Sequence, residues 1–474
     1  MRIGQTSVIH FGSTVTASLV GFAATLYIAQ EFGSSTLGVY SLFIAVITWM
    51  NTGFGHGLHY AVAKRVSEVG DSSRNFGAGL ITQSIVFIIV SVILFIFRQQ
   101  INEYLSFRGT KLLFLAFAII LCSSFVTTIL QSEQKVHISS ILKPIDRIIR
   151  SGIQLGVVFF ALLGGGVAGL IWGYMIGAAV AMVIGITFIS IRPQIPNKEH
   201  FESVLGFTRY SWLSAIEARS FSALDTVILG AFVSTNFIGY YEVAWNLASL
   251  LAIFGTSISQ TLFPAMSELD SRDQHETVSE LITDGIAYLG LFLIPGLFGV
   301  VIIAEHVLVI YGSEFQRAST VLIVLVAARL VYVYQAQFIS TLNALDYPDR
   351  AFHVNLVFIM TNLILNIALV YLFGWFGAAV ATGIATSIGL ILSFQVLREV
   401  IEFKLPLREI LNQLIAAVSM SSIVWVVEPI IIQANFGSII TALLLVGSGT
   451  IAYFIILVSI SEPFRTTLKA NIKV

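Results

Sequence analysis

The sequence predicts an all-α polytopic membrane protein with fourteen transmembrane helices, arranged as two pseudo-symmetric six-helix lobes followed by two C-terminal helices. Of its 474 residues, 57% are hydrophobic and only 11% are charged, whereas soluble globular proteins carry about 25% charged residues. Apolar runs of about 20 residues, long enough to cross a bilayer as a helix, recur along the chain. A repeat of about 200 residues relates its two halves.

The fourteen predicted spans follow one another through short connections. They cover residues 8–30, 37–63, 77–97, 112–130, 148–163, 167–191, 207–232, 237–262, 281–304, 318–341, 353–373, 375–397, 410–432 and 436–460. Six spans fall in an N-terminal lobe (1–200), six in a C-terminal lobe (201–400), and two lie with a cytoplasmic tail in 401–474. No connection is long enough for a soluble domain, which counts against an enzyme with an extramembrane active site.

The distribution of lysine and arginine predicts the orientation. With the N-terminus in the cytoplasm, nineteen of the 25 fall on cytoplasmic segments, four on outer segments and two within spans. Because such residues are enriched on the cytoplasmic side of membrane proteins, both termini are predicted inside. The outer four are Arg98, Arg108, Lys111 and Arg317.

The internal repeat predicts the symmetry of the lobes. Residues 35–68 resemble residues 235–268, and residues 165–185 resemble residues 374–394. An even number of spans per repeat keeps both copies in the same orientation. We therefore expect lobes related by an axis along the membrane normal, with a central cavity between them.

Several motifs resemble a known family: "STLGVYSL" after the first span, "LDTVILGAFVSTNFIGYYEVAWNLA" across the seventh and eighth, "TLFPAMSEL", and "GWFGAAVATGIATS" entering the twelfth. They are similar to the polysaccharide and oligosaccharide flippases of the MATE-like multidrug/oligosaccharidyl-lipid/polysaccharide exporter superfamily. The resemblance implies a multi-pass protein of the cytoplasmic membrane. Its activity would be to move a polyprenyl phosphate- or diphosphate-linked oligosaccharide to the outer leaflet by alternating access, for cell-surface glycan assembly.

The same resemblance implies partners and leaves alternatives open. It implies no catalytic residue and no cofactor beyond a coupling H⁺ or Na⁺. The partners would be the lipid-linked oligosaccharide, membrane lipids and glycan polymerases or glycosyltransferases, but no nucleic acid, and the protein is expected to be a monomer. A MATE-like cation-coupled antiporter of small molecules and a non-transporting scaffold of a glycan assembly complex are the other candidate functions.

Two arginines lie near the predicted membrane midplane. The rise of a helix places Arg219 and Arg329 roughly 16–18 Å into their spans, where each charge costs about 2.5–3.5 kcal/mol. Guanidinium groups suit phosphate oxygens and stay charged when desolvated. We therefore expect both arginines, with Gln337 at helical spacing, to bind the diphosphate in the cavity. The alternative is that they form structural ion pairs with nearby carboxylates.

Three carboxylates are candidates for ion coupling. A carboxylate in a low dielectric can carry a proton or help to hold Na⁺. The alternatives are ion pairs with the arginines or a lock between adjacent helices. The candidates are Glu217, Asp225 and Glu242.

The second span carries polar groups toward its cytoplasmic end, in "NTGFGHGLH". Asn51, His56 and His59 are candidate substrate contacts, and the glycines among them permit bending. No metal site is expected, because no cysteine or carboxylate cluster lies nearby in the sequence. The single cysteine, Cys122, cannot form an intramolecular disulfide and is expected to be a small buried residue.

The segment "LKPIDRIIR" places three cations at the predicted cytoplasmic surface. Interfacial basic residues commonly hold orientation by attracting anionic lipid. The other interpretation is that Lys143, Arg147 and Arg150 collect the lipid diphosphate at the cytoplasmic entrance.

Overall fold

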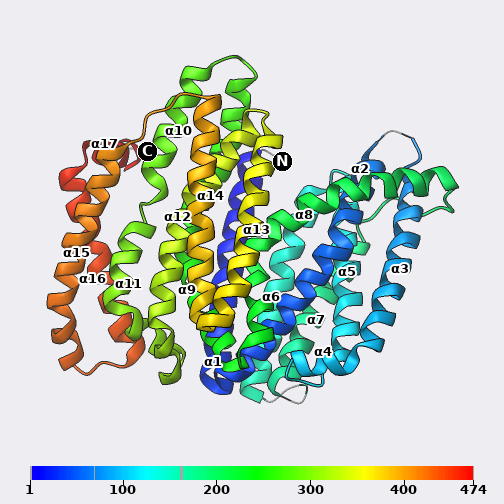
Figure 1. Ribbon diagram of the computed structural model, residues 1–474, viewed down its shortest axis with the longest axis horizontal. Coiled ribbons are helices and arrows are strands. Elements are labelled where there is room, and N and C mark those ends of the chain that lie inside the picture. The colour runs from blue at the N-terminus through cyan, green and yellow to red at the C-terminus, as the bar shows by residue number, and fades with distance from the viewer. Residues whose placement is uncertain (1–2, 69, 161–162, 164, 473–474) are drawn as a thin grey trace. The chain divides into compact units, whose positions relative to one another are not determined.

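The computed structural model describes the backbone of residues 3–68, 70–160, 163 and 165–472, and the side chains of these except 3–19, 207, 209–222 and 470–472. Within the described ranges the chain is helical and contains no strand (Figure 1). Each of the fourteen predicted spans is helical over most of its length. The all-α fold class is therefore confirmed.

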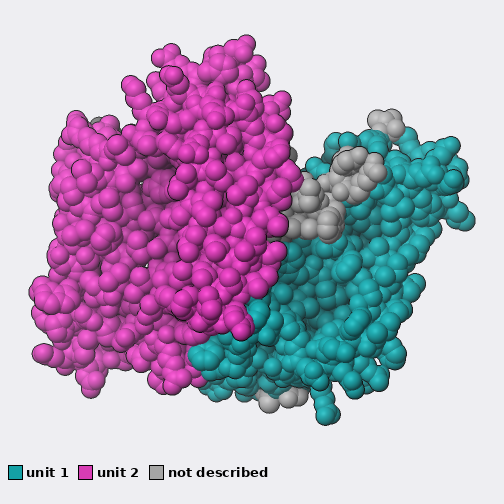
Figure 2. All heavy atoms as spheres, in the orientation of Figure 1, with its two compact units in different colours: residues 1–239 teal, residues 240–474 magenta. Residues whose placement is uncertain are grey.

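The chain divides into two compact units, residues 1–239 and 240–474 (Figure 2). The first unit contains α1 (Ile3–Asn51), the π-helix η1 (Thr52–His56), α2 (Gly57–Ser67), α3 (Ser72–Ile96), α4 (Arg98–Tyr104), α5 (Thr110–Ser132), α6 (Val136–Phe160), α7 (Gly166–Ile186), α8 (Lys198–Phe232) and the first turn of α9 (Thr235–Asp270). The second contains the rest of α9, α10 (His275–Leu289), α11 (Leu293–Leu308), η3 (Val309–Tyr311), η4 (Ser313–Ala318), α12 (Ser319–Ala344), α13 (Pro348–Phe373), α14 (Trp375–Val400), α15 (Leu407–Gln433), α16 (Ser438–Ile460) and α17 (Glu462–Ile472).

The surface of the helices is that of a protein surrounded by lipid. Large apolar side chains are exposed on α3, α15 and α16, among them Phe95, Trp425 and Leu443, whereas Asn366 is fully buried. Contiguous exposed apolar surface of this kind is rare on soluble monomers. Eleven segments of the described chain are long and apolar enough to cross a bilayer. The prediction that Cys122 is buried is wrong: it is exposed on α5, where lipid accommodates a small apolar side chain.

Two helix interruptions show how local chemistry sets the boundaries. α1 bends at Gly33, whose φ of 73° suits glycine, between the first two predicted spans. The predicted continuous span 281–304 is instead divided between α10 and α11. Pro295, in the first turn of α11, has no N–H to donate and its ring crowds the carbonyl of Leu291. The segment still qualifies as a membrane span, but the span prediction did not include this break.

Equivalent segments of the repeat cross each other within the first unit. A Cβ built on Gly38 would lie 1.7 Å from the carbonyl oxygen of Thr235, and one built on Gly239 would lie 2.1 Å from the carbonyl oxygen of Ser34. The hydroxyls of Ser35 and Thr235 are 3.0 Å apart. The crossing is therefore reciprocal, and only glycine allows the backbones this close.

Apolar clusters hold the helices of each unit together. In the first unit, α2, α3, α5 and α8 share a cluster that includes Phe76, Phe125 and Val204. In the second unit, α10, α12, α13 and α14 pack around Phe338. A separate cluster joins α11, α15 and α16 around Met420 (Figure 1).

A buried carboxylate anchors the connection that follows α7. Glu133, at the end of α5, accepts hydrogen bonds from the N–H groups of Ser190 (2.9 Å) and Ile191 (2.6 Å) and from Lys135 Nζ (2.6 Å). Burial raises the pKa of this carboxyl, but the bond from Lys135 and the two N–H groups outweigh burial, so the pKa lies below its usual range. The ionised carboxylate therefore stabilises the fold.

Replacing this carboxylate by an amide, Glu133→Gln, is expected to lower the free energy of unfolding by about 2 kcal/mol at neutral pH, because charge-assisted hydrogen bonds are lost. The folded-state pKa is depressed, so this stabilisation is fully present above the unfolded-state pKa of about 4.3 and is lost as pH falls through the folded-state pKa. Thermal unfolding in detergent should show the two proteins converging in stability below about pH 4. Glu202→Gln, which changes an exposed carboxylate paired with Lys198, is the matched control. A difference that persists at low pH would contradict the assignment.

Candidate functional site

A polar cavity of about 390 Å³ lies inside the first unit, between the end of α1, η1, α2, α5, α6 and α7. It brings together residues that the sequence analysis assigned to two places, the substrate site and the cytoplasmic entrance. Its charged and imidazole groups are His56, His59, Lys143, Asp146 and Arg150.

Two side chains of α6 form the charged wall of the cavity. Arg150 Nη2 donates to Asp146 Oδ2 at 2.5 Å, one helical turn away, and both side chains are about one-fifth exposed. The guanidinium carbon of Arg150 lies 4.1 Å from the ring centre of Tyr174 on α7, a cation–π distance. A Cβ on Gly177 would lie 2.7 Å from the Asp146 side chain. Glycine at 177 therefore allows α6 and this ion pair to sit against α7.

The π-helix η1 and the residue before it form another part of the wall. Asn51, which precedes it, donates from Nδ2 to Ser124 Oγ at 3.1 Å and lies 3.4 Å from His56 Nδ1. A Cβ on Gly55 would lie 2.9 Å from Asn51 Oδ1, so a larger residue would displace the amide. Single π-turns inside α-helices occur frequently at functional sites. The glycine-rich motif of the second span thus aims a polar amide and an imidazole at the cavity.

The two histidines have different surroundings. His59 is 4% exposed, its Nε2 lies 2.8 Å from Gln83 Oε1, and its ring packs 5.4 Å from that of Phe125. His56 is only half-buried, and the two imidazole centres are 6.3 Å apart. His56 is therefore the histidine better placed to contact a ligand, while His59 is held by the interior.

Several cavity atoms have unused hydrogen-bonding capacity. Asn51 Oδ1, Asp146 Oδ1 and Arg150 Nε are buried and have no hydrogen-bond partner among the described residues. Buried polar atoms are usually paired, and exceptions mark functional or hydrated sites. With Lys143 also on the wall, two cations face one carboxylate. The cavity therefore has the chemistry of an anion site.

Arg147, the third cation of its segment, lies on another face of α6. It is exposed, and a Cβ on Gly21 of α1 would lie 2.6 Å from its guanidinium. The absence of a side chain at Gly21 makes room for the guanidinium there. Arg147 is thus close to α1, while Arg150 and Lys143 line the cavity.

Sequence reasoning missed part of this site. Polar residues on one face of α5 line the cavity, and their three- and four-residue spacing was a detectable signal. Asp146 was also detectable, because it precedes Arg150 by one turn. Tyr174 gave no such signal, since its position depends on how α7 packs. The polar α5 residues are Ser123, Ser124, Thr127, Thr128 and Gln131.

The remaining predicted site residues are placed as follows. Glu217 and Arg219 belong to α8, but their side chains lie outside the described residues. Asp225, also on α8, is 6% exposed. Glu242 on α9 is half-buried, and both it and Asp225 have interaction partners. Gln337 is fully buried and donates to Thr341 Oγ1 at 3.3 Å, so it is packed inside the second unit.

Arg329 lies on α12 in the second unit. Its guanidinium carbon is 4.0 Å from the ring centre of Trp245, and its Nη2 donates to Ser249 Oγ at 2.6 Å. Both partners belong to α9. The side chain is half-buried and is held by an aromatic ring and a hydroxyl, a setting in which an arginine keeps its charge.

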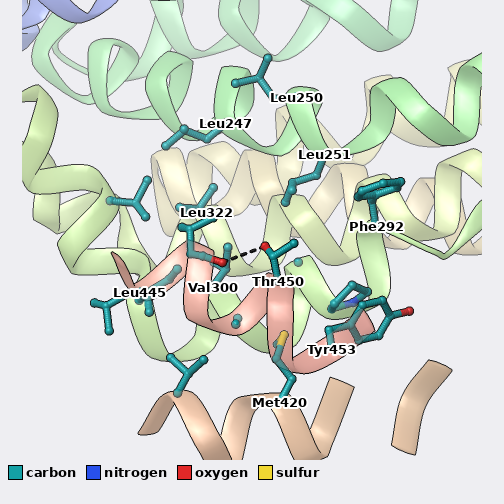
Figure 3. A pocket seen from close by; sticks show the side chains of 18 of the residues that line it. Leu247, Leu250, Leu251, Phe292, Val300, Leu322, Met420, Leu445, Thr450 and Tyr453 are labelled. Carbon is teal, nitrogen blue, oxygen red and sulfur yellow. Dashed lines mark hydrogen bonds between the residues drawn. The ribbon is translucent and has the colours of Figure 1, made fainter. Parts of the chain in front are cut away.

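A second cavity, of about 260 Å³, has the opposite character (Figure 3). It lies in the second unit, and α9, α11, α12, α15 and α16 line it. Its wall is apolar apart from Thr450, whose hydroxyl already donates to Val446 O at 2.8 Å, and Tyr453. Because none of the described residues on its wall is charged, this cavity suits a hydrocarbon chain rather than an anion.

Comparisons with known proteins agree with this architecture. A family model described as "Polysaccharide biosynthesis protein" matches residues 32–320, which include every residue of the polar cavity. "Probable flippase AglR" of Haloferax volcanii is 32% identical over 469 residues, covering 98% of this chain and 97% of that protein. "Probable low-salt glycan biosynthesis flippase Agl15" of the same organism is 26% identical over 484 residues, covering 100% and 99%. The structure of the lipid II flippase MurJ in an inward closed conformation matches with a TM-score of 0.80 at 16% identity, covering 95% and 98%, and so shows the fold.

Proposed function

Because the chain belongs to the family of polysaccharide biosynthesis proteins, we propose that it is a flippase that moves a lipid-linked oligosaccharide from the cytoplasmic to the outer leaflet by alternating access. The observation that carries this proposal is the polar cavity, where two cations face one carboxylate within a unit of membrane helices. Two relatives at full coverage bear the word flippase in their names. The activity is transport, with no covalent change to the cargo.

Arg150 and Lys143 would hold the phosphate groups of the carrier lipid in this cavity. A guanidinium offers two parallel N–H groups to phosphate oxygens, and Lys143 adds a point charge. In the structure the Asp146 carboxylate accepts a hydrogen bond from the same guanidinium. When a cargo phosphate replaces the Asp146 carboxylate, Arg150 keeps an anionic partner. No unpaired arginine is then left in a low dielectric.

Neutral polar groups of the same cavity would bind the sugars. His56 on η1, Asn51 at the end of α1 and the hydroxyls of α5 all line this cavity. Amides, imidazoles and hydroxyls suit sugar hydroxyls because each can donate or accept. The carrier's hydrocarbon chain needs apolar surroundings, which the bilayer offers.

Arg329 on α12 is a further candidate for contact with the diphosphate. Arg329 is held beside Trp245 and Ser249, and together with Arg219 it is proposed to contact the diphosphate. Asp225, Glu242 and Glu217 stay the proposed carriers of a coupling H⁺ or Na⁺. The burial of Asp225 supports its assignment as a proton carrier, because a low dielectric favours the protonated form of a carboxylate.

The membrane topology proposed is fourteen spans with both termini in the cytoplasm. Of the eleven apolar segments of the described chain, one, Val20–Ser67, bends at Gly33 and contains two spans. α6 is not among the eleven because it carries four charged residues, and α8 is not because the side chains of residues 209–222 lie outside the described part of the chain; adding these two helices gives fourteen. We propose that the protein acts as a monomer beside the glycosyltransferases and polymerases that build and use its cargo.

Reconstitution tests this function directly. Purified protein in proteoliposomes should move a polyprenyl diphosphate-linked oligosaccharide between leaflets, read out by the fraction accessible to an external lectin. Arg329→Gln should reduce the initial rate about tenfold, because a charge-assisted contact is worth about 1.5 kcal/mol. Arg350→Gln, which changes an exposed arginine paired with Glu399, should leave the rate unchanged. No cargo movement by correctly folded wild-type protein would overturn the proposal.

A further inference from the structure

A second cation-lined hollow lies in the first unit, away from the polar cavity. Its volume is about 560 Å³, and it lies between the C-terminal end of α3, the short helix α4 and the N-terminal end of α5. These helix ends are opposite to those that carry Glu133 and the start of α3. Arg98, Arg108 and Lys111 line this hollow together with Phe95 and Phe114.

The three cations are exposed, and none of them forms an ion pair with any residue whose side chain the structure describes. Among the described residues, none that lines the hollow is acidic. Arg98 lies over the ring of Phe95, with 5.1 Å from its guanidinium carbon to the ring centre. Three uncompensated positive charges therefore face the same space.

The framework around the hollow is fixed. Asn102 Oδ1 accepts hydrogen bonds from the N–H (3.1 Å) and the hydroxyl (2.8 Å) of Thr110, which ties α4 to the start of α5. The hydroxyl of Tyr104 donates to Val227 O on α8 at 2.5 Å, which ties α4 to the helix bundle. The polar groups of Asn102 and Thr110 are thus engaged within the framework, and the cations remain to bind a ligand.

The position of these charges is unusual for the chain. Only four of the 25 lysines and arginines fall on the segments predicted to face outward, and three of the four meet in this hollow. Positive residues at that end oppose the charge bias that orients a membrane protein. The need to orient the protein in the membrane therefore does not explain why these three cations lie together.

Exposed aromatic side chains lie beside the cations, and this combination suits an amphiphilic ligand. Phe95 is 67% exposed and Phe114 is 42% exposed, and both side chains lie at the ends of apolar membrane helices. A soluble anion would gain nothing from such rings, whereas an acyl chain covers them. We propose that this hollow binds the phosphate of an anionic phospholipid, with Arg98, Arg108 and Lys111 on the headgroup and the two rings against an acyl chain.

A tryptophan reporter tests the site. Phe95→Trp keeps an aromatic ring under Arg98 and places a fluorophore at the hollow. The full chain is reconstituted in phosphatidylcholine vesicles that contain increasing fractions of brominated phosphatidylglycerol, and quenching beyond that of the unsubstituted protein reports binding at this position. The result expected is a preference for the anionic lipid over brominated phosphatidylcholine.

Removing each cation should weaken that preference about fivefold, which corresponds to about 1 kcal/mol per basic residue near a membrane surface. On the reporter background this is expected of Arg108→Gln and of Lys111→Gln, while Lys111→Arg should keep the preference. Arg317→Gln is the matched control, because it removes the fourth predicted outer cation, which lies in the second unit outside the hollow.

Two results would overturn the proposal. One is an unchanged lipid preference in the double variant Arg108→Gln/Lys111→Gln. The other is complete loss of the preference when inorganic phosphate is added at about physiological ionic strength, which would identify a site for soluble anions. If Phe95→Trp impairs folding, Phe114→Trp serves as the reporter. The site is separate from the polar cavity, so failure of this test leaves the flippase proposal standing.

Discussion

Replacing Arg150 by glutamine is expected to slow cargo movement at sub-saturating concentration by about 10- to 100-fold, because a charge-assisted contact to phosphate is worth about 1.5–3 kcal/mol. Arg150 is the cation that the cavity positions most firmly, held by Asp146 and by the ring of Tyr174. Arg150→Lys should recover part of the rate, since it keeps the charge but loses the planar fork. The measurement is the initial rate in proteoliposomes.

The single variant has a structural consequence that must be separated from transport. Without Arg150, the Asp146 carboxylate is left unpaired in a cavity where it is only 23% exposed, which destabilises the fold. The double variant Asp146→Asn/Arg150→Gln removes both charges and should regain most of the apparent melting temperature. If Arg150 binds cargo, the double variant stays slow. A stable double variant with the wild-type rate would show that the arginine serves only to pair with Asp146.

Adding one methyl group at Gly38 is expected to destabilise the first unit by about 3 kcal/mol, the upper end of the range for overpacking. The new Cβ would lie 1.7 Å from the carbonyl oxygen of Thr235, a backbone atom that cannot move without displacing the start of α9. Gly239→Ala should have a similar effect, because its Cβ would lie 2.1 Å from Ser34 O. The apparent melting temperature in detergent, followed by size-exclusion chromatography, measures both.

Because each glycine contacts the other segment at the same crossing, the effects of the two substitutions should not be additive. Once Gly38→Ala has forced the two segments apart, Gly239→Ala meets a looser contact, so the double variant should lose less than the sum of the single losses. Gly383→Ala on α14 is the control, because a Cβ there meets no atom within 4 Å and helical alanine is favoured over glycine by roughly 0.5–1 kcal/mol. Strict additivity would indicate that the two glycines do not share one contact.

The fold class could be predicted because the physical cause acts locally. Each apolar run must satisfy its own backbone hydrogen bonds in lipid, and a helix does this within the run. The boundary between the first two spans was also readable, since Gly33 marks a bend. The break between α10 and α11 was missed, because Pro295 lies inside a run whose hydropathy is continuous. There, backbone chemistry overrode the apolar pattern.

The candidate site was predicted in pieces. Asn51 and His56 were expected to contact substrate, and Arg150 and Lys143 were assigned to an entrance. The contact of α6 with α7 and of α2 with α5 brings all four to one cavity. No local pattern encodes that meeting, because it depends on which helix faces pack together. Gly177 contributes to this packing, because a side chain there would collide with Asp146. That role can be recognised only once the structure shows that the two residues are in contact.

By itself the sequence determined that this is an all-helical membrane protein, and it predicted which polar residues contact a cargo. Lipid imposes those properties residue by residue, through hydropathy, charge and the need to satisfy the backbone. Only the tertiary structure decided which groups share a space: that Arg150 is paired with Asp146 inside a cavity, that Gly38 and Gly239 form one crossing, and that Arg98, Arg108 and Lys111 meet in one hollow. Electrostatic and steric interactions act over a few ångströms of space, and residues far apart in the chain reach that range only through the packing of helices.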